Sequence, residues 1–316
     1  MFQKPSESDI QSAAIRIQPF IHQTPVLESG FFNELTHAQI YFKCENFQKA
    51  GAFKSRGAMN ATLSLLPEEL KQGVATHSSG NHAQALARAA KICGTKAYIV
   101  MPDNAPKVKV SAVEHYGGEI IFCEPTLEAR ESTLQQVIER TGSVLIHPYN
   151  DLRIIAGQAT ACMELVNVVR DLDLVFCPVG GGGLLSGTAL SLHYFSPKTK
   201  LIGCEPLGAD DAFRSFKSGE IVPSVYPKTI ADGLLTSLGS LTFPIIRHYV
   251  HDIVTVTDQQ IINAMYYVWE RMKIVIEPSS AVPVAVALSG KVDLKELKIG
   301  IILSGGNADL TNLPWN

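Results

Sequence analysis

The sequence predicts an α/β protein built from two open parallel-sheet domains. Its 316 residues exceed the usual size of a single domain. Strand-like and helix-like patterns alternate along the whole chain, an order typical of parallel sheets covered by helices. Several short apolar runs end directly in glycine or polar turns, as buried parallel strands do. Because ligands of open α/β sheets bind beyond the carboxyl ends of the strands, we expect the functional residues to gather there.

The first predicted element is a helix that begins at Ser8, with Gln11 three residues later completing a capping box. Apolar side chains then fall on one helical face, and Pro19 ends or kinks the helix. Buried parallel strands are predicted further along the chain, at 97–101, 119–123, 172–179, 201–204 and 298–303.

Two helices between these strands have clear end signals. The alanine-rich stretch 79–92 predicts a helix that ends at Gly94. Thr257 and Gln260 form a capping box in front of a second amphipathic helix. Small side chains on the first of these helices indicate close packing against a sheet.

Composition excludes several function classes. The net charge of −3 gives no electrostatic footprint for nucleic acid or an anionic membrane. Segment 1–9 is polar and is not a signal peptide, and no apolar run approaches the ~20 residues of a membrane helix. No metal-type or disulfide-type spacing joins the cysteines, so we expect reduced thiols in a cytoplasmic protein at Cys44, Cys93, Cys123, Cys162, Cys177 and Cys204.

Lys54 stands in the first of four candidate site loops, 43–60, with the sequence KCENFQKAGAFKSRGAMN. A lone lysine is normally a solvated surface charge. Here Phe53 and Gly51 give it an apolar, glycine-containing surrounding. A desolvated lysine loses its proton more easily and becomes an amine nucleophile for an aldehyde cofactor.

A second loop, 77–82, has the sequence HSSGNH and opens the alanine-rich helix. The backbone N–H groups at Ser78, Ser79 and Gly80 would form a carboxylate site there. The alternative is a plain helix cap with a glycine turn. The last loop, 304–307, has the sequence SGGN, and Ser304 could hydrogen-bond a heteroaromatic nitrogen; the alternative is a glycine-rich turn.

The remaining loop has four consecutive glycines, 180–183, between a strand and a helix. Glycine lets the backbone wrap an anion closely, so the run favours phosphate binding over a simple tight turn. Neither the dinucleotide pattern GxGxxG nor the nucleotide pattern GxxxxGK[ST] can be completed from any of these glycines. Together the four loops describe a site for an amino acid and pyridoxal phosphate (PLP).

These segments resemble the fold-type-II family of PLP enzymes, whose fold is that of the tryptophan synthase β subunit. The matching signatures occur in the family's order, with HPYND and IAGQAT between them: FKSRGAMNA, SSGNHAQALA, VGGGGLLSG and LSGGNAD. The resemblance implies two α/β domains with PLP in the cleft between them. The large domain would be 1–72 and 148–316, and the small mobile domain 73–147. A homodimer is the family expectation.

The resemblance also implies roles for the loop residues. Lys54 would hold the cofactor as a Schiff base and move the Cα proton on one face. Phe53 would pack beside the ring, Asn81 would hydrogen-bond the phenolic oxygen, and Ser304 would face the pyridine nitrogen. The phosphate would be bound by Gly180, Gly181, Gly182, Gly183 and the N–H of Leu184. The substrate carboxylate would be bound by the loop of Ser78, Ser79, Gly80, Asn81 and His82.

The implied activity is β-elimination of water from L-serine or L-threonine, giving a 2-oxo acid and ammonia. Many threonine dehydratases of the family have alanine where this chain has Ser79. A serine there resembles serine racemases and threo-3-hydroxyaspartate dehydratases, where the hydroxyl faces the lysine across the cofactor. A racemase with dehydratase side activity and a hydroxyaspartate dehydratase are therefore alternatives. A NAD-dependent Rossmann enzyme and a catalytically inactive amino-acid sensor are alternatives of other classes.

A divalent cation is a further implication. Segment 205–211 resembles the cation loop of the racemase group, with ligands from the Glu205 and Asp211 carboxylates and the Ala209 carbonyl. Such oxygen ligands suit Mg²⁺, Ca²⁺ or Mn²⁺; the alternative is an acidic surface loop. Racemases of this type can also bind ATP between subunits, and Lys49 and Asn307 fall in the corresponding segments.

Overall fold

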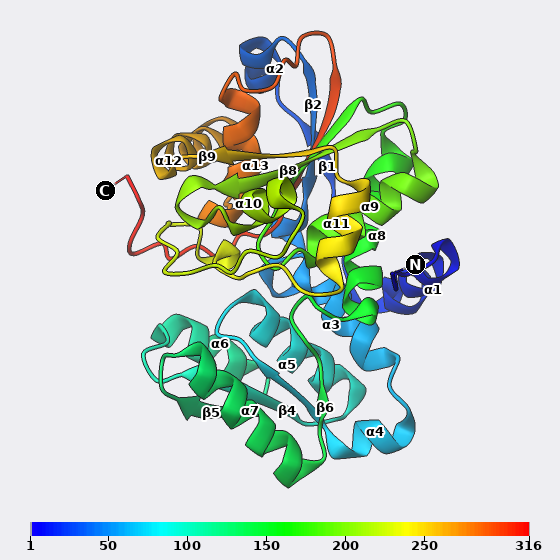
Figure 1. Ribbon diagram of the computed structural model, residues 1–316, viewed down its shortest axis with the longest axis vertical. Coiled ribbons are helices and arrows are strands. Elements are labelled where there is room, and N and C mark those ends of the chain that lie inside the picture. The colour runs from blue at the N-terminus through cyan, green and yellow to red at the C-terminus, as the bar shows by residue number, and fades with distance from the viewer. Residues whose placement is uncertain (1, 316) are drawn as a thin grey trace.

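Two sheets form the framework of the computed structural model, which describes residues 2–315 (Figure 1). Met1 and Asn316, the outer ends of the predicted large domain, lie outside the described residues. One sheet has six strands in the order β1-β2-β10-β7-β8-β9, and the other has four in the order β5-β4-β3-β6. The predicted α/β class with parallel sheets is confirmed.

The six-stranded sheet is parallel except at one edge. Its strands are β1 (Val26–Glu28), β2 (Gln39–Cys44), β7 (Leu174–Pro178), β8 (Lys200–Pro206), β9 (Asp252–Val256) and β10 (Lys298–Leu303). Only β1 runs antiparallel, against β2. Two apolar clusters cover the two faces, one built with α12 and α13 and the other with α8 and α9. The sheet is therefore buried on both faces, which explains its nearly continuous apolar strands.

The helices around this sheet come from both ends of the chain. They are α1 (Glu7–Ile17), α2 (Gly30–Thr36), α3 (Lys54–Leu63), α8 (Leu152–Val168), α9 (Gly183–Phe195), α10 (Asp211–Ser218), α11 (Thr242–Tyr249), α12 (Asp258–Tyr267) and α13 (Pro278–Leu288). Helix α4 (Pro67–Gln72) lies instead beside the four-stranded sheet, where Leu70 packs against its core and accepts a hydrogen bond from Thr95 (Figure 1). None of the helices in residues 2–315 is both long and apolar enough to cross a membrane.

The four-stranded sheet is wholly parallel and has its own core. Its elements are β3 (Val74–His77), α5 (Asn81–Cys93), β4 (Ala97–Pro102), α6 (Lys107–His115), β5 (Glu119–Cys123), α7 (Leu127–Thr141) and β6 (Val144–Leu145). Apolar side chains of α5 pack on one face and those of α7 on the other. These elements fall inside 73–147, the range expected for a small domain. In Figure 1 they form a separate lobe below the larger sheet.

The cap of α1 differs from the sequence prediction. The helix cap is Ser6 and not Ser8, because Asp9 accepts the Ser6 N–H while the Ser6 side chain accepts from the Asp9 N–H. These reciprocal hydrogen bonds with Asp9 identify Ser6 as the cap residue of α1. The α-helix does end before Pro19, where a short 3₁₀ turn follows.

Other predicted ends are confirmed. Gly94 ends α5 with φ 67°, and the Thr257–Gln260 capping box opens α12. Helix α5 begins at Asn81, two residues later than predicted, because Gly80 is its cap. All six cysteines are free thiols; four are buried, and Cys93 and Cys123 are half-buried.

Candidate active site

Lys54 is the first residue of α3, and the end of β10 holds the loop in front of it. The Phe53 N–H donates to the Ser304 carbonyl at 3.0 Å. One residue earlier, Ala52 pairs with Gly305 in an isolated antiparallel bridge. The lysine loop is therefore joined to the strand end that carries Ser304. Two of the predicted site loops, 43–60 and 304–307, therefore meet through backbone hydrogen bonds.

The ε-amine of Lys54 lies in a confined place. Its Nζ donates to the Pro148 carbonyl at 2.7 Å and lies 5.2 Å from the centre of the Phe53 ring. Burial lowers the pKa of Lys54 from 10.5 to about 8, although the carboxylate of Glu277 acts in the opposite direction. An amine of lowered pKa is a usable nucleophile near neutral pH.

The glycine loop follows β7 and leads into α9. Gly182 has φ 89° and caps the helix. Added side chains would not fit: a Cβ at Gly181 would overlap the Tyr149 ring, and one at Gly180 would lie 3.0 Å from Leu234 Cα. Thr242 fixes the loop by donating to the Gly181 carbonyl at 2.8 Å. The first N–H groups of α9 have no intrahelical acceptor and point out of the helix end, as an anion site requires.

Segment 147–150 is shared by the lysine and the glycine loop. Pro148 accepts from Lys54, and the neighbouring Tyr149 ring packs under the glycines. His147 accepts the N–H of Asn150 at 2.9 Å through Nδ1. Burial, with His77 and Lys54 adding to it, lowers the pKa of His147 to about 4. The wall between the two loops is therefore uncharged at neutral pH.

The predicted carboxylate loop joins β3 to α5. The Ser78 N–H donates to the Val100 carbonyl at 3.1 Å, and the Gly80 N–H to Ser78 Oγ at 3.4 Å. Ser79 is half-buried, and His82 is buried with Nε2 3.1 Å from the Ile146 carbonyl. Burial holds the pKa of His82 well below its ordinary value. His82 is therefore a neutral residue that fixes the start of α5.

Glu277 is a site residue that sequence reasoning missed. The amide of Asn81 donates to both of its oxygens, at 2.9 and 3.0 Å, and the Glu277 N–H donates to the Gly305 carbonyl. Burial raises the pKa of Glu277 to about 7, although the Asn81 amide acts in the opposite direction. Asn81 also accepts from Asn307 at 2.8 Å. Asn81, predicted as a cofactor ligand, is thus bonded to Glu277 and Asn307 of the large lobe.

A second contact joins the two lobes. Lys109 of α6 forms an ion pair of 2.5 Å with Asp232, which lies between β8 and β9. Neither residue has a local sequence signature. The HPYND motif could have indicated Tyr149, but nothing near Glu277 or Asp232 distinguishes them from surface acids.

The predicted cation ligands lie together at the end of β8. Glu205 is 1% exposed and accepts the N–H groups of Ala212 and Phe213, both at 2.8 Å. Asp211, also 1% exposed, has no hydrogen-bond partner for either oxygen among the described residues. Burial raises the pKa of Glu205 to about 9 and that of Asp211 to about 6. Ala209 is buried beside them.

Oxygen donors of this kind fit a hard cation, which would compensate the unpartnered carboxylate. Across residues 2–315 no group of three or more His, Cys, Asp and Glu side chains is placed to hold a metal ion. A cation at this place would therefore depend on backbone carbonyls such as that of Ala209, as the sequence predicts.

A cavity of about 700 Å³ lies elsewhere in the large lobe and contains none of these residues. Its lining includes His37 and Lys295, which precede β2 and β10. It therefore lies at the amino ends of these strands. Active sites of open α/β sheets lie at the other end.

Comparison with known proteins decides the family. The model of the family described as "Pyridoxal-phosphate dependent enzyme" matches residues 17–305. The chain belongs to this family of PLP-dependent enzymes. Its cofactor is PLP, which sets aside the dinucleotide-binding alternative.

Individual relatives narrow the group within the PLP family. The serine racemase of Dictyostelium discoideum is 52% identical over 309 residues, which cover 96% of this chain and 95% of that protein. A beta-hydroxyaspartate dehydratase of Paracoccus denitrificans (strain Pd 1222) is 49% identical over 312 residues, 99% of each chain. The structure of maize serine racemase has a TM-score of 0.96 at 44% identity, covering 98% of this chain and 95% of that one. The predicted fold-type-II fold and the likeness to the serine racemase group are confirmed.

The geometry fits this PLP family assignment. An amine of lowered pKa at Lys54 suits covalent attachment of an aldehyde. The four glycines carry no side chains that would screen their backbone N–H groups, so a phosphate can approach the loop closely.

Proposed function

We propose that the chain is an ammonia-lyase that removes water from a small β-hydroxy amino acid, L-serine or L-threonine. The observation that carries this proposal is the position of Lys54. Its amine of lowered pKa lies against segment 147–150, which also supports the glycine loop. Lys54 holds the cofactor covalently through Nζ, with Phe53 beside the ring.

The remaining loops bind and orient. The N–H groups of the glycine loop and of Leu184 bind the phosphate, and Asn81 meets the phenolic oxygen. The helix start at 78–82 would bind the substrate carboxylate, because a helix amino end favours an anion. The N–H groups of Ser78 and Gly80 already donate within the protein, so the other donors of this segment would make the contact. Ser304 offers the pyridine nitrogen a neutral hydroxyl. When bound, PLP supplies an electron sink that makes the Cα–H of the substrate acidic.

Proton transfer falls to Lys54. Its Nζ would take the Cα proton on its own face and could return a proton to the departing β-hydroxyl, which leaves as water. Hydrolysis of the resulting enamine by one water molecule gives ammonia and a 2-oxo acid, pyruvate from serine and 2-oxobutanoate from threonine. His82 and His147 are held neutral by burial, so neither places a positive charge beside the Lys54 amine.

A second candidate function is racemisation of serine, with elimination as a side activity. Ser79 favours it, because a hydroxyl opposite Lys54 can return a proton to the other face of Cα. Serine racemases among the relatives support this candidate. The hydroxyaspartate dehydratase relative supports a third substrate, threo-3-hydroxyaspartate, for the same two residues.

The experiment is a paired product assay with PLP and Mg²⁺. L-Serine, L-threonine and threo-3-hydroxyaspartate are supplied in turn, and D-serine and 2-oxo acids are measured together. Ser79→Ala is expected to abolish D-serine formation and spare elimination from L-serine. Equal loss of both products would contradict the two-face assignment. A cofactor absorbance band that persists in Lys54→Ala would contradict the role of Lys54.

The cation, the dimer and the lobe movement are parts of the same proposal. We propose Mg²⁺, or Ca²⁺ or Mn²⁺, at Glu205, Asp211 and the Ala209 carbonyl, supported by the unpartnered oxygens of Asp211. A homodimer with ATP near Lys49 and Asn307, in the cytoplasm, follows the pattern of the racemase group. The lobe 73–147 would close over substrate, a common gating motion. Sedimentation tests the homodimer, and the product assay repeated with ATP tests the effect of ATP.

A further inference from the structure

Helix α3 begins at the reactive lysine without a conventional cap. Phe53, at the cap position, makes no side-chain bond to the helix, and the first turn contains no acidic residue. That turn instead carries two cations, Lys54 and Arg56. Positive side chains near a helix amino end oppose the helix dipole and are unfavourable. Other groups must therefore stabilise the start of α3.

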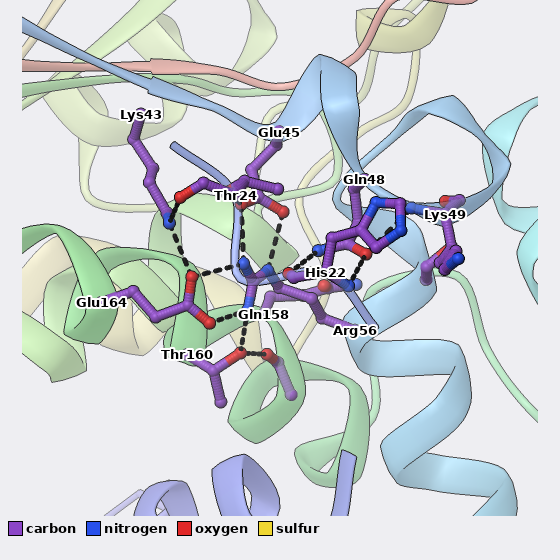
Figure 2. Close-up of polar contacts among 12 residues, drawn as sticks. His22, Thr24, Lys43, Glu45, Gln48, Lys49, Arg56, Gln158, Thr160 and Glu164 are labelled. Carbon is purple, nitrogen blue, oxygen red and sulfur yellow. Dashed lines mark hydrogen bonds and ion pairs between the residues drawn. The ribbon is translucent and has the colours of Figure 1, made fainter. Parts of the chain in front are cut away.

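Two contacts do so: the Gly57 N–H donates to Gln158 Oε1 at 3.2 Å, and Arg56 holds the turn through a buried network (Figure 2). Its side chain is 0% exposed, and all five of its N–H donors find acceptors. Nε and Nη2 donate to the two oxygens of Glu45 at 2.7 and 2.8 Å. Nη1 and Nη2 donate to the two oxygens of Glu164 at 2.7 and 2.8 Å. The fifth donor reaches Thr160 Oγ1 at 3.1 Å.

The network is also balanced in charge. Lys43, which is 1% exposed, donates to Glu164 at 2.6 Å and to the Thr24 carbonyl at 2.8 Å. Two buried cations therefore face two carboxylates. Thr24 Oγ1 donates to Glu45 at 2.5 Å and satisfies a further acceptor. Buried ion pairs are tolerated when they are complete in this way, and removal of one partner is strongly unfavourable.

The geometry ties three elements together at one point. Glu45 directly follows β2, while Thr160 and Glu164 lie on α8. Helices α3 and α8 also approach backbone to backbone, because a Cβ at Gly157 would lie 2.6 Å from Gly57 Cα. Arg56 clamps the first turn of α3 between β2 and α8, two residues after Lys54.

We propose that Arg56 is a positioning residue for Lys54, because it holds the first turn of α3 in place through its bidentate bonds to two carboxylates. The inference rests on the proposed attachment of the cofactor to Lys54. Glu45 and Glu164 hold the guanidinium plane in one orientation, and the first turn of α3 follows it. Arg56 itself touches neither cofactor nor substrate.

The test compares Arg56→Lys with a control of matched burial. Lysine keeps the positive charge but presents its donors from one point, so it cannot engage two carboxylates bidentately. Glu164→Gln is a milder variant, because Glu164 is 16% exposed and water can reach it. Leu165→Ala is the control: it truncates a 0% exposed side chain next to Glu164 on α8 and leaves the network intact.

Two quantities are measured on each purified protein: the melting temperature, and the rate at which Lys54 of the PLP-free protein captures added PLP. Borohydride trapping and peptide mass spectrometry give that rate at Lys54. A displacement of about 1 Å can cost on the order of 100-fold in rate. We expect Arg56→Lys to slow capture by about that factor and Glu164→Gln by less. Leu165→Ala should lower the melting temperature and leave capture unchanged.

Arg56→Lys that captures PLP at the wild-type rate would overturn the proposal. Slowing in proportion to the lost melting temperature in all three variants would also overturn it, because Arg56 would then act only through stability. Capture by wild type at a lysine other than Lys54 would instead overturn the proposed attachment site. The two failures are distinguished by which peptide carries the label.

Discussion

The charge of Lys54 near neutral pH gives the sharpest prediction. With a pKa of about 8, about one quarter of the Lys54 amines are unprotonated at pH 7.5, against about one in a thousand for an ordinary lysine of pKa 10.5. The folded chain thus raises the reactive fraction by roughly 250-fold before any cofactor binds. Burial is the cause, and the nearby carboxylate of Glu277 works against it.

Glu277→Gln separates these two effects. The substitution removes the charge that favours the protonated amine and keeps the size of the side chain. The pKa of Lys54 should therefore fall below its wild-type value, and the rate of amine modification should rise most between pH 7 and 8. Glu277 has a pKa of about 7, so the effect should be largest where its carboxylate is ionised.

Competitive labelling of the PLP-free protein with acetic anhydride measures the pKa of Lys54 without catalysis. Peptide mass spectrometry follows Lys54 across pH, with Glu34→Gln, an exposed acid on α2, as the control of equal charge change. A wild-type midpoint near 10 would refute the burial argument. A Glu277→Gln midpoint equal to wild type, or shifted equally in Glu34→Gln, would refute the role of Glu277.

Three further predictions concern other parts of the site. Gly181→Ala places a Cβ against the Tyr149 ring, and we expect at least a tenfold weaker binding of PLP by spectroscopic titration; binding unchanged would remove the case for a close phosphate approach. Added Mg²⁺ should raise the melting temperature, EDTA should reverse the gain, and Asp211→Asn should abolish it; a gain that survives in Asp211→Asn would place the cation elsewhere. Lys109→Ala should change stability by less than about 1 kcal/mol, because the pair with Asp232 is partly exposed, while KM rises if lobe closure uses that pair.

The sequence predicted those parts of the site that are local. Lys54, the glycine run and Ser304 each belong to a short segment that follows a strand, and the strand ends bring them together. The same reasoning predicted five of the strands, β4, β5, β7, β8 and β10, since apolar runs bounded by turn residues need no tertiary information. Strands β1, β2, β3, β6 and β9 were not predicted, and the three residues of β1 are too few for a periodic signal.

Residues that join the two lobes could not be predicted from local sequence patterns. Glu277 reaches Asn81 over 196 residues of sequence, and Lys109 reaches Asp232 over 123. The two residues of each pair lie too far apart in the sequence for a short motif to contain both. The network of Arg56 was missed for the same reason: its second carboxylate, Glu164, lies 108 residues away on another helix.

The structure separates charges that are fixed from charges that titrate. Burial acts to raise the pKa of Glu45, but Arg56 outweighs it and the pKa is lowered; the pKa of Arg56 is raised in return. The pair of Arg56 and Glu45 therefore keeps its charges near neutral pH. Around Lys54 the histidines at 82 and 147 are held neutral by burial. Lys54 and Glu277, by contrast, have pKa values of about 8 and about 7, so both groups titrate near neutral pH. The amine proposed to accept the substrate proton is thus held on a helix turn whose Arg56–Glu45 pair keeps its charges.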